Sequence, residues 1–391
     1  MPMANTVFVL GAGRMGLVAA RDVAESDLVD SVILGDIETS RAERLCKELG
    51  PDKIKAMRVD GTDRSNLARA IRDSQVLINA IWYEHNVRVM KTVIEMKVHY
   101  NNLGGLFHVT RQQMELNDAA QRAGVTAVLG GGASPGITNV MCAASAEEFE
   151  SVEDMRIRVG AKQESHAESD KLVFPFAIPT ILDEYSKRPV MYLDGRFQDV
   201  EPLSGEEEVE FAQPIGKNVC HYSIHSETAT LPLSFKGVRH VDFKLGVSEK
   251  LFRAIKPLVE AGMCDNAPID VKGQKISPRD FAIAYLASRA SDVEPLRYIG
   301  LRTEVTGVKN GRKTCQIREV VGEPSKKLGV RNATGLLTGI GASIIAQFIL
   351  AGKIVKNGVV APEICVPTEP FLRELERRKI RVTMKELKVS S

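Results

Sequence analysis

The sequence has no excess of charge of either sign. Its 391 residues include 52 Lys and Arg and 50 Asp and Glu, which gives a formal net charge of only +2. Proteins that hold nucleic acids gather basic side chains to bind the phosphate backbone. We therefore expect no nucleic-acid partner.

Cysteine is scarce, and the first residues lack the pattern of a leader. The six cysteines show no CxxC spacing, which argues against both a disulfide framework and a cysteine-based zinc site. No Lys or Arg precedes the first apolar run, at residues 7–10, and a glycine-rich turn follows it directly. A secretory signal has a different pattern, so we expect a cytoplasmic protein with reduced thiols.

Long uncharged hydrophobic runs are absent except for one. Residues 332–352 carry no charged side chain, and Gly335 and Gly339 form a GxxxG step. That length and that step would permit a membrane helix. Two threonines, a serine, a glutamine and Gly341 interrupt the run, however. We predict a close-packed core helix over 333–351 and no membrane partner.

Short apolar segments alternate with amphipathic ones over the first third of the chain. Strands separated by helices of this length predict βαβ units and a doubly wound parallel sheet. The predicted strands are 6–10, 31–36, 54–59, 76–80, 98–101 and 125–129, and the predicted helices are 15–25, 39–49, 64–72, 86–96 and 111–123.

From about residue 151, apolar and polar residues alternate, which is typical of half-buried antiparallel strands. Asn310-Gly311 predicts a hairpin turn between two of them. The predicted fold class is α/β, a doubly wound parallel Rossmann sheet with a second α+β domain of largely antiparallel sheet. The predicted strands of the second domain are 155–159, 208–211, 219–225, 239–244, 301–308 and 314–320.

The predicted domains follow from these patterns. We expect a dinucleotide-binding domain at residues 1–136, completed by about 332–370, and a substrate-binding and dimerisation domain at 137–331. A C-terminal tail is expected at 371–391.

A glycine-rich turn follows the first predicted strand directly. Residues 11–16 read Gly-Ala-Gly-Arg-Met-Gly, and Asp36 ends the second strand twenty residues later. In the Rossmann fingerprint the first glycine allows a tight turn, the second lets the pyrophosphate approach, and the third lets the helix pack on the strand. The free N–H groups of that helix then face the phosphates. The predicted cofactor-binding residues here are Gly11, Gly13, Arg14, Met15, Gly16 and Asp36.

The choice between NAD and NADP rests on Asp36. Its carboxylate accepts hydrogen bonds from the ribose hydroxyls and repels a 2′-phosphate. Arg41 lies a turn into the next helix, and Glu38 adds negative charge. We therefore predict NAD as the cofactor.

Three more residues lie at the ends of later strands. Asp60 could contact the adenine amino group; alternatively this segment starts a helix, which Thr62 or Asp63 would cap. Asn79 and Ala80 end the fourth strand, where the chain is expected to pass the nicotinamide ribose.

Several motifs together resemble the saccharopine dehydrogenase-like family. Within it, Ser134-Pro135-Gly136 and the segment from Ser226 to Pro232 are most similar to the L-lysine 6-dehydrogenase branch, although Asn102 stands where many relatives have Asp. The resemblance implies oxidation of an amine with hydride transfer to nicotinamide, and it suggests a homodimer. For lysine, the ε-amine would become an imine, hydrolyse to a semialdehyde and cyclise. The motifs are 11–16, 59–63, 79–86, 103–105, 131–139, 226–232 and 358–363.

The candidate catalytic residues follow the fourth strand or lie in the second domain. Tyr83 or His85 could act as a general base, and Glu84 could pair with a substrate ammonium; capping of a helix by Asn86 is the alternative. Glu227 is a further catalytic candidate. The predicted substrate-binding residues are Glu84, Asn86, Gly104, Gly105, His225, Thr228, Arg239 and Arg302, and Ser134 and Pro135 are assigned to the cofactor.

The second domain contains candidate residues for a carboxylate site and for a metal site. An amino-acid carboxylate calls for an arginine, and Arg239 and Arg302 are the candidates, although surface ion pairs are the commoner fate of such residues. His221 and His225 would lie about 13 Å apart along a strand, so we predict no metal site.

Two other functions remain open from the sequence. One is a saccharopine- or opine-type dehydrogenase acting on a secondary amine, for which a dicarboxylic product would need more than one clamping arginine. The other is a sensor that binds NAD without turnover.

Overall fold

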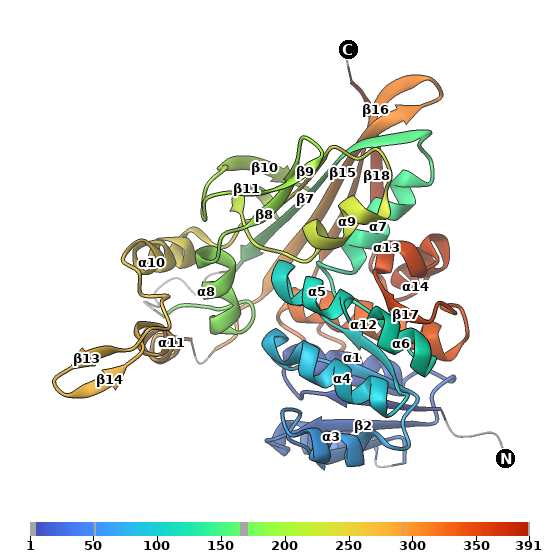
Figure 1. The fold of residues 1–391 in the computed structure, drawn as a ribbon, viewed down its shortest axis with the longest axis vertical. Helices are drawn as coiled ribbons and strands as arrows, with labels where there is room; N and C mark the ends of the chain where they lie inside the picture. Colours follow the sequence, from blue (N-terminus) through green and yellow to red (C-terminus); the bar gives the residue numbers. More distant parts are fainter. Residues whose placement is uncertain (1–4, 51, 165–170, 292, 390–391) are drawn as a thin grey trace.

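The first part of the chain, completed by residues 358–360, forms a seven-stranded parallel sheet. The computed structural model describes residues 5–50, 52–164, 171–291 and 293–389. The strand order is β17-β6-β5-β4-β1-β2-β3, and every pair runs parallel. The predicted Rossmann-type sheet is thus confirmed (Figure 1). Its strands are β1 Thr6–Leu10, β2 Ser31–Asp36, β3 Ile54–Arg58, β4 Val76–Asn79, β5 His99–Asn102, β6 Thr126–Val128 and β17 Gly358–Val360.

Helices cover both faces of this sheet. One hydrophobic cluster joins the strands to α1 (Arg14–Ala24), α2 (Ser40–Leu49) and α12 (Ala333–Leu350). A second cluster joins them to α3 (Arg64–Ile71), α4 (Asn86–Glu95) and α6 (Asn117–Ala123). The single helix predicted over 111–123 is wrong, because α5 (Leu106–Met114) ends and α6 begins after a short break.

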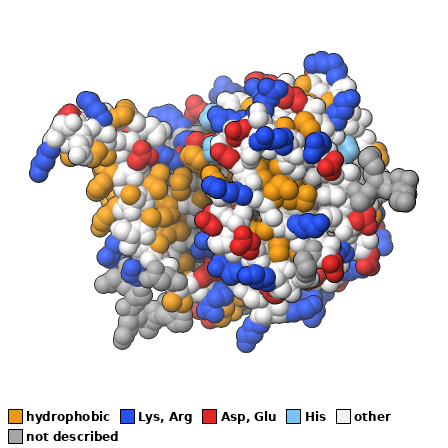
Figure 2. All heavy atoms as spheres, turned by 90° about the horizontal axis from the view of Figure 1, so that it is seen from below, with side chains coloured by type: hydrophobic (Ala, Val, Ile, Leu, Met, Phe, Trp, Pro, Cys, Tyr) orange, Lys and Arg blue, Asp and Glu red, His pale blue; other side chains and the backbone are white. Residues whose placement is uncertain are grey.

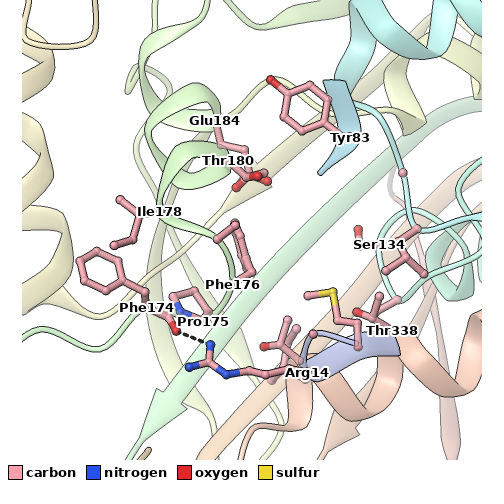
Figure 3. Close-up of a pocket in the computed structure, with 18 of the residues that line it drawn as sticks. Arg14, Tyr83, Ser134, Phe174, Pro175, Phe176, Ile178, Thr180, Glu184 and Thr338 are labelled. Carbon is pink, nitrogen blue, oxygen red and sulfur yellow. Dashed lines mark hydrogen bonds between the residues drawn. The ribbon is translucent and has the colours of Figure 1, made fainter. Parts of the chain in front are cut away.

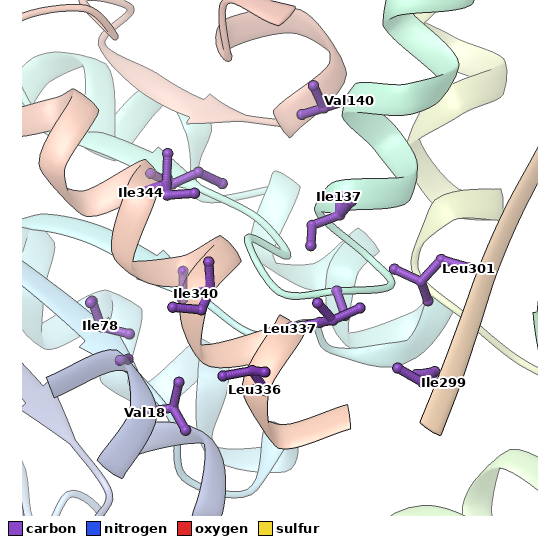
Figure 4. Close-up of a cluster of buried hydrophobic side chains, with 14 of the residues drawn as sticks. Val18, Ile78, Ile137, Val140, Ile299, Leu301, Leu336, Leu337, Ile340 and Ile344 are labelled. Carbon is purple, nitrogen blue, oxygen red and sulfur yellow. The ribbon is translucent and has the colours of Figure 1, made fainter. Parts of the chain in front are cut away.

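The uncharged helix α12 is a core element. Among the described residues it is the helix that is long and apolar enough to cross a membrane, and 89% of it is buried inside the protein. It packs against α1 on one side and against β4, β5 and the second domain on others (Figure 4). A Cβ on Gly339 would lie 2.6 Å from the Cβ of Val18. The small residues of this helix therefore allow close packing, as the sequence predicted.

The second part of the chain is built on a nine-stranded mixed sheet. Its main order is β10-β11-β12-β7-β15-β16-β18, with β8 pairing with β12 and β9. All pairs are antiparallel except β12 with β7. The predicted hairpin at Asn310-Gly311 joins β15 to β16, and both residues have positive φ. The strands are β7 Ser151–Gln163, β8 Val190–Leu193, β9 Arg196–Asp199, β10 Glu207–Phe211, β11 Gly216–Tyr222, β12 His240–Leu245, β15 Arg297–Lys309, β16 Arg312–Gly322 and β18 Val382–Lys388.

An arm of helices and a small hairpin projects from this sheet (Figure 1). Figure 2 shows hydrophobic side chains gathered on this lobe. Phe281 and Tyr285 are more than half exposed and stack on each other. The arm consists of α8 Ile178–Ser186, α10 Glu249–Glu260, α11 Pro278–Ser288, β13 Ile269–Val271 and β14 Gln274–Ile276. The remaining elements are the short helix η1 Tyr83–His85, α7 Ile137–Ala146, α9 Glu227–Ser234, α13 Pro362–Cys365 and α14 Thr368–Arg377.

The C-terminal residues are not a separate tail. Strand β18 pairs along its whole length with β16, from Val320↔Val382 to Thr314↔Lys388. Helix α14 before it is anchored by Phe371 and Leu375, both fully buried. The tail predicted at 371–391 is therefore corrected over 371–389, and its last two residues lie outside the described residues. The segment was predicted as a tail because it is rich in charged residues, but it forms a helix with one apolar face and an edge strand.

Candidate functional site

A cavity of about 590 Å³ lies where the glycine-rich turn of the first domain meets the second domain. From the first domain, the turn, the end of β4 and the loop at Ser134 line it. From the second domain, apolar residues of 172–178 and the helix α8 line it. Figure 3 shows Arg14, Ser134 and Thr338 on one side of the cavity and Phe174–Ile178 on the other.

The glycine-rich turn has the geometry that a dinucleotide needs. Gly11 has a φ of +105°, and its N–H donates to the carbonyl of Gly35 at 2.7 Å. A Cβ on Gly16 would lie 1.8 Å from the Gly11 oxygen, so the strand and helix touch there. A Cβ on Gly13 would meet no atom within 4 Å. Space therefore remains at Gly13, at the N-terminus of α1, where the pyrophosphate of a nicotinamide dinucleotide would be held.

Asp36 supports this turn from the neighbouring strand. One carboxylate oxygen accepts the Ala12 N–H at 2.6 Å, and the other accepts the Glu38 N–H at 2.9 Å. Arg41 is exposed and lines the same cavity. The carboxylate is thus fixed beside the place predicted for the ribose.

The structure separates the roles that the sequence left open around Asp60. Asp63 caps α3 by accepting the Asn66 N–H at 2.9 Å. Asp60 instead accepts both the N–H and the hydroxyl of Thr62, and this hydroxyl lowers the pKa of Asp60. Asp60 does not line the cavity that the described residues form. Its contact with adenine stays a prediction.

The ends of β4 and β5 form a buried amide network. Asn79 donates to Asn86 at 2.8 Å, and Asn86 donates to the carbonyl of Gly104 at 2.8 Å. Both asparagines are 1% exposed, so they fix the loop that carries Gly104 and Gly105. Ala80, Gly104 and Gly105 line the cavity, whereas the two asparagines do not.

Of the catalytic and substrate-binding candidates at residues 83–86, one lines the cavity. The Tyr83 hydroxyl donates to Asp183 at 2.7 Å and accepts from Lys187 at 3.0 Å. Burial and the Asp183 carboxylate raise the pKa of Tyr83 far above its ordinary value. A phenol that holds its proton so strongly is a poor general base. Tyr83 therefore joins the two domains and walls the cavity.

Two other predicted residues of that segment point elsewhere. Glu84 lies 3.7 Å from Lys187 and is partly exposed, and His85 packs edge-on against Trp82. Neither lines the cavity. The sequence placed them at the nicotinamide because they follow a strand end, but η1 turns their side chains away.

His225 and Glu227 form a buried pair. The strand predicted over 219–225 is corrected, because β11 ends at Tyr222 and Glu227 begins α9. This turn brings His225 Nδ1 into hydrogen-bond contact with a Glu227 carboxylate oxygen. The other oxygen accepts the hydroxyls of Ser134 at 2.5 Å and Thr138 at 2.9 Å. Glu227 itself is fully buried and does not line the cavity, whereas His225 and Ser134 do.

The pair holds opposite charges. Burial works against the charged form of each group. Although burial lowers the pKa of His225, the Glu227 carboxylate raises it above the ordinary value. Burial likewise raises the pKa of Glu227, but the His225 imidazolium brings it below the ordinary value. Thr228 donates to the His225 carbonyl at 3.1 Å and so holds the same turn.

The two arginines predicted to clamp a carboxylate lie away from the cavity. Arg239 is exposed, and its backbone N–H donates to Glu153. Arg302 is paired with Glu304 at 2.7 Å on the sheet. Neither lines the cavity. Salt bridging, the alternative that the sequence left open, is what the structure shows for Arg302.

Two buried charged residues of the cavity were missed by the sequence analysis. Glu184 comes from α8 and Arg297 from the start of β15, and each is 4% exposed. Burial raises the pKa of Glu184 to about 8 and lowers that of Arg297 to about 10. The only sequence signal for Glu184 is a pair of acids, Asp183-Glu184, in an otherwise uncharged helix.

The glycine-rich turn is also tied to the second domain. Arg14 donates to the carbonyl of Phe174 at 3.1 Å and pairs with Glu294 at 2.7 Å (Figure 3). Among the described residues, no three His, Cys, Asp or Glu are grouped so that they could hold a metal ion.

Comparison with known proteins agrees with this architecture. The model of the saccharopine dehydrogenase NADP binding domain matches residues 7–128, and that of the saccharopine dehydrogenase C-terminal domain matches residues 132–380. The solved saccharopine dehydrogenase (L-Glu forming) of Saccharomyces cerevisiae superposes with a TM-score of 0.74 at 20% identity, over 98% of this chain and all of that one. This likeness concerns the fold.

Two curated relatives cover nearly the whole chain. Carboxyaminopropylagmatine dehydrogenase of Synechocystis is 24% identical over 94% of each chain. Carboxynorspermidine synthase of Vibrio cholerae is 22% identical over 95% of this chain and 94% of its own. Together with the two family models and the dinucleotide turn, these relatives identify a nicotinamide-dependent dehydrogenase. The chain belongs to the saccharopine dehydrogenase family.

Proposed function

We propose that the protein oxidises an amine of an amino acid that carries a single carboxylate, with the ε-amine of L-lysine as the first candidate. The observation that carries this proposal is one cavity with a buried cation, Arg297, and a buried carboxylate, Glu184. An amino acid with a distal amine offers a carboxylate and an ammonium, the two complementary charges. Arginine binds carboxylates through two parallel hydrogen bonds.

The arginines that line the cavity indicate how many carboxylates a substrate can place there. Among the described residues three arginines line the cavity, and of these Arg14 is paired with Glu294 while Arg41 is exposed. Arg297 is therefore the buried arginine that is available to bind a substrate carboxylate in the cavity. A substrate with several carboxylates, such as saccharopine, would leave some of them unpaired in an apolar site, which is costly.

The chain's own residues would orient this substrate. Bound nicotinamide supplies the hydride acceptor. Apolar residues from Phe174 to Ile178 exclude water on one side, and Tyr83 and Ser134 wall the other (Figure 3). The carboxylate at Arg297 and the amine at Glu184 together fix the direction in which the substrate lies.

A second candidate is the reductive formation of a secondary amine. It is supported by the relatives, whose names denote polyamine derivatives that bear a carboxy group. Such compounds also combine one carboxylate with distal cationic nitrogens. The same two charged residues would therefore serve them.

The deciding experiment is a cofactor assay in both directions. We expect NADH production from lysine at alkaline pH, with the cyclic product trapped by o-aminobenzaldehyde. NADH from carboxylated polyamines but not from lysine would select the second candidate. Steady turnover of saccharopine, without either of the others, would contradict the single-carboxylate proposal.

Replacing Arg297 with Met tests the carboxylate site. We expect KM for lysine to rise roughly 100-fold, as when one partner of a buried charge pair is removed. Oxidation of cadaverine, which has the same amine but no carboxylate, should change little. Arg302→Met is the matched control on the same strand and should resemble the parent. A parallel loss of NADH affinity would instead assign Arg297 to the cofactor.

The second prediction concerns the cofactor. We propose NAD over NADP because the Asp36 carboxylate opposes a 2′-phosphate. Fluorescence titration should show NADH binding about tenfold more tightly than NADPH, or about 1.4 kcal/mol. Asp36→Asn keeps an oxygen for the Ala12 N–H but removes the charge, so it should reduce this preference. Equal affinities in the unmodified protein would contradict the proposal.

A further inference from the structure

Glu184 is a buried acid that lines the cavity. Its side chain lies on α8, one turn after Thr180, and both residues line the cavity (Figure 3). One carboxyl oxygen, Oε2, is buried and has no hydrogen-bond partner among the described residues. A buried polar atom left unpaired costs about 1–3 kcal/mol. Such an atom at the wall of a substrate cavity indicates a group that pairs with the ligand.

The neighbouring acid, Asp183, is ion-paired within the protein. Its carboxylate pairs with Arg279 of α11 at 2.8 Å and with Lys187 at 3.4 Å, and it accepts the Tyr83 hydroxyl. It is 0% exposed and does not line the cavity. Of the two acids in the pair, Glu184 is therefore the one available to a substrate.

Charged and aromatic groups from the neighbouring elements surround Glu184 and its helix. His225, just before α9, and Glu227, its first residue, act on Glu184 through charge, as does Asp183 on the same helix as Glu184. Helix α10 packs against α8 through the rings of Phe252 and Tyr185. Burial dominates and raises the pKa of Glu184, the two carboxylates add to the rise, and His225 opposes it.

We propose that Glu184 accepts a proton from the substrate ammonium before hydride transfer, with the His225–Glu227 pair as its positioning residues. This inference rests on the proposed amine oxidation. An N–H bond of the ammonium breaks and an O–H bond forms on Glu184, which leaves a neutral amine. The amine carbon then loses its hydrogen with the electron pair to the nicotinamide, and an iminium ion remains.

The proton balance suits such a step. A general base works best with a pKa near the working pH, and an ordinary carboxyl, near 4.3, is too weak to remove a proton from an ammonium near 10.4. Burial raises the pKa of Glu184 to about 8 and narrows this gap. The imidazolium of His225, held by Glu227, limits the rise so that the carboxylate still forms at mildly alkaline pH.

The first test is the pH profile of Glu184→Gln. We expect kcat/KM for the amine to fall about 10²- to 10³-fold, within the usual range for a lost general base, and the inflection near pH 8 to disappear. NADH affinity should stay unchanged. Glu184→Asp keeps a titrating carboxyl and should recover part of the rate. Glu260→Gln, on the exposed side of α10, is the matched control.

The second test measures the proton without turnover. With NADH bound, no hydride can leave the amine, and lysine binding can be followed by calorimetry at pH 7 in buffers of different ionisation enthalpy. The parent should release a proton on binding. In the empty cavity Glu184 is mostly protonated at this pH, and lysine arrives as an ammonium ion. The pair that they form holds one proton fewer, and this proton passes to the buffer. Glu184→Gln should release none.

The positioning role has its own signature. His225→Gln removes a positive charge beside Glu184 and leaves the Glu227 carboxylate uncompensated. Both changes raise the pKa of Glu184, so the inflection should move to higher pH. If His225 had a purely structural role, the substitution would lower the rate without shifting the inflection in the pH profile.

The outcomes separate this inference from the function it rests on. If the parent oxidises an amine but Glu184→Gln keeps its rate and its pH profile, Glu184 is not the proton acceptor. The same holds if proton release is equal in parent and variant. If the parent oxidises no amine at any pH, the proposed function fails. Proton release that is still lost in Glu184→Gln would then leave Glu184 as a ligand-binding acid only.

Discussion

Replacing Gly13 with Val is expected to abolish NADH binding while the protein stays folded. A Cβ at this position would meet no protein atom within 4 Å, so the fold can accept the larger side chain. The same space is where the pyrophosphate must approach the backbone at the N-terminus of α1. We expect the affinity to fall at least about 100-fold, or about 2.7 kcal/mol. Fluorescence titration of NADH and a thermal melt check both parts.

Gly16→Val is the matched control for this prediction. Its Cβ would lie 1.8 Å from the Gly11 oxygen, so the substitution should lower the melting temperature strongly or prevent folding. The two variants thus separate a glycine needed for the ligand from one needed for the fold. NADH binding by Gly13→Val at the affinity of the parent would exclude this turn as the cofactor site.

Replacing Glu227 with Gln should cost about 3–5 kcal/mol of the free energy of unfolding, as when one partner of a buried ion pair is removed. The carboxylate is fully buried and contacts His225, Ser134 and Thr138. Glu206→Gln is a control of the same chemistry at the surface. Glu206 lies 3.5 Å from His221 and is 77% exposed, so its loss should cost less than about 1 kcal/mol. Chemical denaturation of the three proteins measures these differences.

The pH dependence of that cost follows from the two pKa shifts. The pKa of His225 is raised, so its contribution is complete below its ordinary value of 6.5 and is lost as the pH rises through the raised value. The pKa of Glu227 is lowered, so its contribution is complete above 4.5 and is lost as the pH falls through the lowered value. The difference between parent and Glu227→Gln should therefore be largest between about pH 4.5 and 6.5. A difference that falls neither as the pH is raised above 6.5 nor as it is lowered below 4.5 would contradict a charged pair.

The sequence analysis succeeded where the signal is local. The parallel strands were found because short apolar runs alternate with helices. The turn at residues 11–16 was found because its glycines lie directly between β1 and α1 in the sequence. Four of the six strands predicted for the second domain were too short. For example, 155–159 is the centre of β7, which is paired on both sides and extends over Ser151–Gln163.

The site was less predictable because it depends on how distant segments meet. Glu184 and Arg297 lie on separate elements, and neither belongs to a motif. Tyr83 was found as a site residue, but its role depends on Asp183, which no spacing in the sequence places beside it. The closeness of His225 and Glu227 likewise depends on the turn into α9, which a strand pattern does not predict.

The position of α12 and β17 in the chain has a consequence for synthesis. The ribosome releases β1 to β6 long before Ala333–Leu350 and Gly358–Val360 are made. Until then the apolar face of α1 that meets α12 has nothing to cover it, since these two helices pack closely at Val18 and Gly339. At about 5–20 residues per second this surface is exposed for many seconds. The second domain is therefore made while the first is still unfinished, and a nascent chain stopped before Ala333 should bind chaperones or aggregate.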